Sequence, residues 1–226
     1  MTIKDKKHWS DQSEVARDEL RDAVEQTVDW LIEHRREASY AAGGILGAAL
    51  LTGLVAYSRH AKMTESWDKL SLAEMYAYAG HPIEAQSALA QVSEAGGGSA
   101  AAAALARMLE GDILIAGQKY ADAATSYGKA AEIAPEGIRP FALAEKVMTL
   151  EEEGKMAECA AAAQSFLDTN ADHLLAAQVH SILARCQMAQ GQADAAKSTL
   201  QRISLQYPNS PWAEWATTRL QASTPK

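Results

Sequence analysis

Four consecutive segments of this chain share one spacing of small side chains, and this repetition restricts the fold more than any other feature. Each segment has a small or branched residue in its first half and a small residue 12 positions later. The pairs are Ala73 and Ala85, Gly111 and Ala123, Val147 and Cys159, and Ala184 and Ala196. Corresponding positions of consecutive segments are 38, 36 and 37 residues apart. A constant internal distance in four segments predicts one repeated structural unit.

Each unit is expected to be a hairpin of two antiparallel helices. Alanine, the best helix former, is abundant, and the chain has only 6 prolines. Small residues let two helices cross closely while bulky neighbours fill the surrounding space. A glycine between the two halves is expected to end each first helix in the left-handed conformation, at Gly80, Gly117, Gly154 and Gly191. One hairpin cannot bury its apolar face alone, so the units should stack into an all-α solenoid.

The second and fourth units resemble the tetratricopeptide repeat (TPR). The second carries Gly111, Tyr120, Ala123, Tyr127, Ala130 and Pro135, and the fourth carries Ala184, Ala196, Leu200, Ile203 and Pro208. The first and third units are degenerate, with Lys146 and Val147 where a large and a small residue are expected. The resemblance implies a domain over residues 64–222 made of about four TPR-like hairpins that bind other proteins.

Two segments border these units. Glu94–Ala100 (EAGGGSA) is expected to be a flexible joint between the first and second units. After Pro208, Ser210 and Pro211 have the form of a helix start. The helix that follows should cover the last repeat with one apolar face, formed by Trp212, Trp215 and Leu220.

Residues 38–58 form a stretch of 21 residues without a charged side chain, ASYAAGGILGAALLTGLVAYS. As a helix it would be ~31 Å long, against about 30 Å for the hydrocarbon core of a bilayer. We interpret it as a single transmembrane helix. Two alternatives remain open: a buried helix of a soluble core, and a signal peptide cleaved near Ser58, although a lead of 37 residues is unusual for a signal. Gly43 and Gly47 form a GxxxG pattern, which is typical of closely packed transmembrane helices.

Residues 1–37 are expected to form a cytoplasmic arm that contains an amphipathic helix. Asp11 and Glu14 have the form of a capping box, and apolar residues recur at helical spacing at Leu20, Val24, Val28, Leu31 and Ile32. This helix would lie on a membrane or pair with a partner helix. A short arm that stays inside while the longer domain is exported is the simplest topology.

The charge pattern and the missing motifs exclude several classes of function. The net charge is −8 and no basic stripe is present, which argues against nucleic-acid binding. No phosphate-binding loop, metalloprotease motif or nucleophile elbow occurs, so we expect no enzyme, no cofactor, no metal site and no small-molecule substrate. Cys159 and Cys186 fall on neighbouring predicted helices. They could pack as small apolar residues or form a disulfide in an oxidising compartment.

The first helices of such arrays line a concave surface, where protein partners would bind. On this geometry the groove should contain Tyr78, Met108, Ile115, Met148, Arg185 and Met188. Methionine is flexible and suits varied apolar ligands. Several of these residues could equally belong to the core.

A short cytoplasmic arm, one transmembrane helix and degenerate TPR-like repeats together resemble the ancillary SecYEG translocon subunit family of bacterial inner membranes. This resemblance implies a periplasmic repeat domain that assists proteins emerging from the translocon, beside other membrane-bound chaperones. The partners would then be the translocon and exported clients. The alternative is a structural accessory subunit of a larger membrane complex, packed through Gly43 and Gly47. The long acidic arm and the Ala/Gly-rich span depart from the family.

Overall fold

The computed structural model describes residues 21–22, 24–94 and 98–222. It divides into two compact units, residues 1–58 and 59–226, and each is described by itself. In the first unit, residues 24–33 are helical and expose the apolar side chains of Val24, Val28, Leu31 and Ile32. Helix α2 (Arg35–Tyr78) then begins and contains the predicted span. The predicted capping residues Asp11 and Glu14, together with Leu20, lie outside the described residues.

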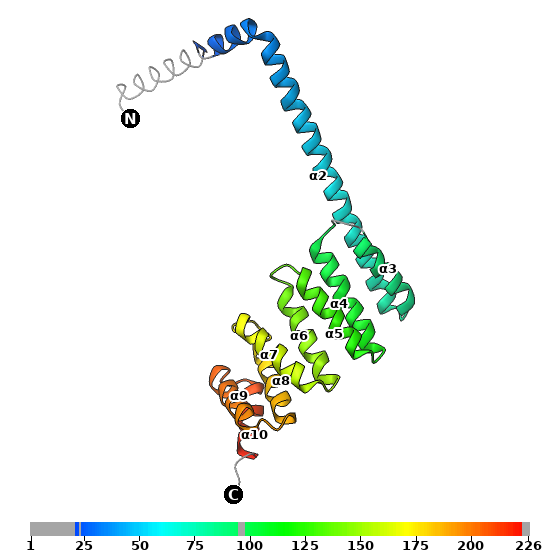
Figure 1. Cartoon of the computed structure of the whole chain (residues 1–226), viewed down its shortest axis with the longest axis vertical. Coiled ribbons are helices and arrows are strands. Elements are labelled where there is room, and N and C mark those ends of the chain that lie inside the picture. The colour runs from blue at the N-terminus through cyan, green and yellow to red at the C-terminus, as the bar shows by residue number, and fades with distance from the viewer. Residues whose placement is uncertain (1–20, 23, 95–97, 223–226) are drawn as a thin grey trace, which may run out of the picture. The chain divides into compact units, whose positions relative to one another are not determined.

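The second unit is all-helical where it is described, and its helices follow one another as a row of hairpins (Figure 1). After the end of α2 come α3 (Pro82–Glu94), α4 (Ala100–Ala116), α5 (Tyr120–Ile133), α6 (Arg139–Glu152), α7 (Met156–Thr169), α8 (Ala176–Ala189), α9 (Ala193–Gln206) and α10 (Pro211–Ala222). From α3 to α10 each helix packs against the next one along the chain, and α8 also contacts α6 and α10. This order is the predicted solenoid of four hairpins with a C-terminal capping helix.

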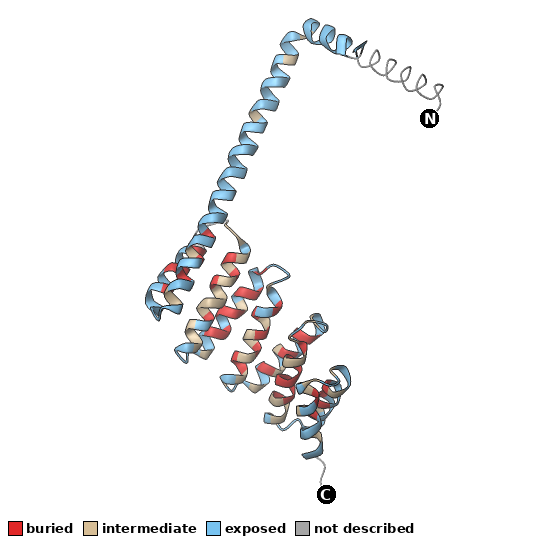
Figure 2. Cartoon of the chain, turned by 180° about the vertical axis from the view of Figure 1, so that it is seen from behind, coloured by how far each residue is buried: buried red, intermediate tan, exposed pale blue. Residues whose placement is uncertain are grey.

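The eight small positions that define the repeat are all buried, which confirms the packing argument. Gly111 shows the constraint most directly, because a Cβ added there would lie 2.6 Å from Cζ of the buried Tyr127 ring. The core is a series of apolar clusters along the row, not one central cluster (Figure 2). Such a distribution is expected when each hairpin buries its face only against its neighbours.

The turns follow the prediction in three units and differ in the second. Gly80, Gly154 and Gly191 have φ angles of +78°, +83° and +73°. Gly117, however, has φ −87° and caps α4 by donating its N–H to the carbonyl of Ile113, so the prediction for this glycine was wrong. Gln118 adopts the left-handed conformation in its place, at φ +59°. The left-handed residue therefore lies one position later than predicted, at a glutamine, which adopts this backbone conformation less readily than glycine does.

The segments that border the repeats make defined contacts. In the predicted joint Glu94–Ala100, residues 95–97 lie outside the described residues. Ser99 caps α4 by accepting a hydrogen bond from the N–H of Ala102 at 3.3 Å, and Gly98 lies so close to Ser66 that a Cβ would collide with its hydroxyl. The described end of this joint is therefore packed and not free. At α10, Ser210 accepts from the N–H of Ala213 at 3.2 Å. Trp212, Trp215 and Leu220 pack on the last repeat, as predicted.

Candidate protein-binding surface and membrane span

The six residues predicted for the groove all lie on first helices of the hairpins. Tyr78 is on α2, Met108 and Ile115 are on α4, Met148 is on α6, and Arg185 and Met188 are on α8. Tyr78 is 89% exposed, and the other five are half-buried. These side chains accordingly differ in how much surface they offer to a partner.

The two central methionines contribute to the core as well as to this surface. Met108 packs against a buried cluster of Ala130, Ala131 and Ala142. Met148 packs against the largest apolar cluster, and its sulfur lies 3.0 Å from Nε2 of Gln178 on α8. Both methionines therefore hold neighbouring hairpins together, and only their remaining exposed atoms are open to a ligand.

Arg185 is already paired within the chain. Its guanidinium donates to both carboxylate oxygens of Glu151 on α6, at 2.6 and 2.7 Å, and to the hydroxyl of Ser181 at 3.3 Å. A two-pronged ion pair of this kind fixes the position of the guanidinium. Arg185 thus joins the first helices of the third and fourth units, and a partner would meet a neutral pair at this point.

A second polar contact joins the two helices of the second unit. The hydroxyl of Tyr127 on α5 donates to Asp112 on α4 at 2.5 Å. Burial, together with the bond to Asp112, raises the pKa of Tyr127, so the phenol stays protonated. On α6, burial and the charges of Asp112 and Glu152 raise the pKa of Glu145. This part of the first-helix face is acidic, and within the described chain no group of three His, Cys, Asp or Glu side chains could hold a metal.

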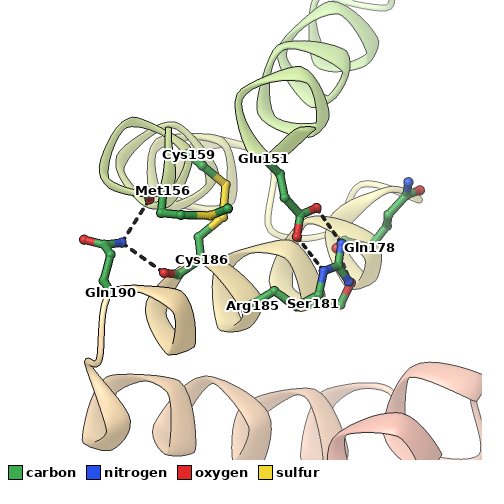
Figure 3. The surroundings of a disulfide bond; sticks show 8 residues. All are labelled: Glu151, Met156, Cys159, Gln178, Ser181, Arg185, Cys186 and Gln190. Carbon is green, nitrogen blue, oxygen red and sulfur yellow. Dashed lines mark hydrogen bonds and ion pairs between the residues drawn. A yellow bond between two sulfur atoms is a disulfide. The ribbon is translucent and has the colours of Figure 1, made fainter. Parts of the chain in front are cut away.

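Cys159 on α7 and Cys186 on α8 form a disulfide with a Cα–Cα distance of 6.4 Å (Figure 3). The bond lies at the junction of the third and fourth units and both cysteines are fully buried. Gln190 reinforces the same junction, since its Nε2 donates to the carbonyls of Met156 at 2.9 Å and Cys186 at 3.2 Å. The sequence left two arrangements open, packed free thiols or a disulfide, and the structure has the disulfide.

Helix α2 is long and apolar enough to cross a membrane, by length and composition. Within residues 38–58 the large apolar side chains are exposed, including Leu46 at 64% and Leu50 at 69%. A Cβ added at Gly43 or at Gly47 would meet no other atom within 4 Å. The most apolar window of the helix is not buried within the structure (0%).

The comparisons with known proteins agree with this architecture. The tetratricopeptide repeat family matches residues 150–222, which is less than half of the chain. Two solved structures of TPR-like repeats from a Podosopora anserina protein described as a kinesin light chain are similar, one of them a variant. Each is 17% identical, with a TM-score of 0.53 over 69% of this chain and 82% or 83% of its own. The fold is a TPR-like solenoid. No curated protein matches the sequence.

TPR-like solenoids are typically scaffolds that present an extended surface to other proteins. Sequence reasoning missed one feature of the solenoid, a cleft between α5, α6 and α7 that several lysines line. The signal for it was present in the degenerate third unit, where Lys146 and Val147 replace the expected pair of a large and a small residue. The role of Lys146 depends on how α5 packs against α6, and the sequence pattern does not specify that packing.

Proposed function

We propose that this chain is a membrane-anchored, protein-binding scaffold of the bacterial inner membrane that assists exported or membrane proteins. One observation carries the proposal: a chain with a TPR-like solenoid also has an uncharged helical stretch of 21 residues whose leucines are exposed. Exposed apolar surface of this extent is costly in water and favourable in a bilayer. The solenoid supplies the protein-binding function, and residues 38–58 supply the anchor.

The disulfide supports an oxidising location for the repeat domain. Disulfides persist in secreted proteins and in the bacterial periplasm, whereas cytosolic thiols are kept reduced. We therefore place residues 64–222 in the periplasm and residues 1–37 in the cytoplasm. In this topology the translocon and proteins that emerge from it are the proposed partners, which is the role that the resemblance to its ancillary subunits implies.

A second candidate is a structural accessory subunit of a larger membrane complex. The GxxxG spacing of Gly43 and Gly47 favours it, because small residues on that face would let a partner helix approach closely. The two candidates share the anchor and differ in what holds the partner. An ancillary factor would bind varied clients through the solenoid, whereas an accessory subunit would bind one complex through the span.

Purification of the full chain from membranes in mild detergent, followed by mass spectrometry, separates the candidates. The comparison uses the double variant Gly43→Leu/Gly47→Leu and, as control, Thr52→Leu, which lies about half a turn around the helix from Gly43. Several substoichiometric partners that persist in the double variant support the ancillary factor. One stoichiometric complex that only the double variant loses supports the accessory subunit. A chain that purifies without any membrane or exported protein contradicts both.

A further inference from the structure

The arm helix, residues 24–33, has one apolar half and one polar half. At about 100° per residue, Thr27 and five large apolar side chains follow one another around one side of this helix. The five are all at least 44% exposed in the structure (Figure 2): Val24, Val28, Trp30, Leu31 and Ile32. The opposite side carries Glu25, Gln26, Asp29 and Glu33. The helix is therefore amphipathic, and its apolar side chains are exposed.

The width of the apolar half favours a bilayer over a partner helix as its cover. A partner helix in a coiled coil covers a narrow seam, formed by the a and d positions of each heptad. Here the apolar residues extend over about half of the circumference, from Trp30 through Val24 to Ile32. A flat bilayer surface covers a face of this width, and helices that lie in a membrane interface have this pattern. The apolar half thus fits a lipid surface better than it fits one helix.

The charges of the arm helix argue against attraction by anionic lipids as the source of membrane binding. Residues 24–33 contain three acidic residues and no basic one, and the carboxylate of Glu25 pairs with Arg21 at 3.0 Å. All three carboxylates belong to the polar half, which would face water above a membrane. Burial of the apolar half must therefore supply the affinity for lipid.

The junction with the proposed span would hold the arm helix at the bilayer. Only four residues, His34 to Glu37, separate the arm helix from the uncharged stretch. A turn at His34 interrupts the helix, so the arm need not continue along the axis of the span. Trp30 stacks on His34 with ring centroids 4.9 Å apart, near the boundary at which interfacial aromatic residues are common. Arg35 and Arg36 follow, and their long side chains could reach lipid phosphates.

We propose that residues 24–33 lie on the cytoplasmic surface of the membrane, with the apolar half in the lipid interface and the carboxylates toward water. The inference rests on the proposed anchor at residues 38–58. A helix this short would bind lipid weakly by itself, but its covalent link to the span keeps it at the surface at a high effective concentration. The chain then holds the membrane by two elements, the span and the arm helix.

A spin label on each half of the arm helix tests the proposal. The full chain carries one introduced cysteine, which alone reacts with the label because Cys159 and Cys186 are bonded and buried, and is reconstituted into phosphatidylcholine vesicles. At Val28→Cys, collisions of the label with oxygen, which concentrates in lipid, should exceed collisions with a water-soluble nickel chelate. At the matched control Gln26→Cys, on the polar half, collisions with the nickel chelate should dominate. In the Val28→Cys background, Ile32→Glu should move the label into water, whereas Gln26→Glu should not.

A third label, at Leu50→Cys in the span, separates failure of the arm from failure of the anchor. Lipid contact at Leu50→Cys with water contact at Val28→Cys would overturn the location of the arm and leave the anchor intact, whereas water contact at both would overturn both. Protection of Val28→Cys from both reagents would indicate a partner helix, and spin–spin broadening there would indicate a second copy of the chain. Either result overturns the proposal, as does lipid contact that requires phosphatidylglycerol in the vesicles.

Discussion

His180, on α8, is the buried titratable side chain whose protonation should matter most for stability. It is only 3% exposed, and its Nδ1 lies 3.0 Å from the carbonyl of Ala176 and 3.2 Å from the hydroxyl of Tyr207. Its Nε2 is buried with no partner in the described structure. Burial lowers the pKa of His180 below its usual 6.5, and Arg202 lowers it further, against the opposing effect of the Ala176 carbonyl.

A lowered pKa in the folded state fixes the sign of the pH effect. Below pH 6.5 the unfolded chain binds a proton at His180 more readily than the folded chain does, so stability should fall as the pH falls through that value, by up to about 1.4 kcal/mol per pH unit. Denaturant unfolding of the wild type at pH about 7.5 and about 5.5 measures this loss. The His180→Phe variant should lose less stability over this interval.

The control for this prediction is His81→Gln, because His81 is exposed in the same compact unit. It should keep the pH dependence of the wild type. The raised pKa of Glu145 has the opposite sign and is common to all three proteins, so it cancels in the comparison. An identical pH dependence in His180→Phe and the wild type would rule out His180 as the source.

At the same scale, the sequence predicted which residues are buried better than it predicted their partners. Gly111 and Tyr127 were both identified from the repeat pattern, and they pack against each other. Asp112 as the acceptor of the Tyr127 hydroxyl was not predicted, nor was the pairing of Arg185 with Glu151. A periodic pattern specifies which face of a helix is buried, but a hydrogen bond depends on the rotation of two helices relative to each other.

At the scale of helices, the disulfide joins α7 to α8 across the junction of two repeats. Elsewhere in the array the position of Cys159 is alanine, as at Ala85, Ala123 and Ala196. The helices can therefore pack without a bond, and the contribution of the disulfide adds to that packing. Spacing alone could not decide whether the two thiols would bond, because both arrangements suit a small buried side chain.

Reduction of this disulfide should destabilise the chain measurably. The bond closes a loop with a sequence separation of 27 residues, for which loop entropy suggests between about 3 and 4 kcal/mol. Denaturant unfolding with and without a thiol reductant measures the difference. The double variant Cys159→Ala/Cys186→Ala should resemble the reduced wild type and should not respond to reductant. An unfolding midpoint of the wild type that does not move with reductant would argue against the bond.

At the scale of the whole chain, the repeat number, the hairpin order and the capping helix were all predictable from sequence. They follow from the repeated spacing, which specifies a unit that must stack. The cleft beside Lys146 was not predictable, because it depends on the space left at Gly128 when α5 and α6 pack together. The surfaces that would select a partner are therefore visible only once the units are stacked.

The central claim is that a stack of alanine-lined hairpins is tethered to a bilayer by residues 38–58. Alkaline extraction of bacterial membranes that contain the full chain tests it most directly, with the mass of the chain measured in each fraction. We predict that the uncleaved chain stays in the membrane pellet and that Leu50→Arg/Leu51→Arg, at about +3 kcal/mol for each arginine in the span, shifts it to the supernatant. A wild-type chain that is released into the supernatant, or one shortened near Ser58, would contradict the tethered scaffold.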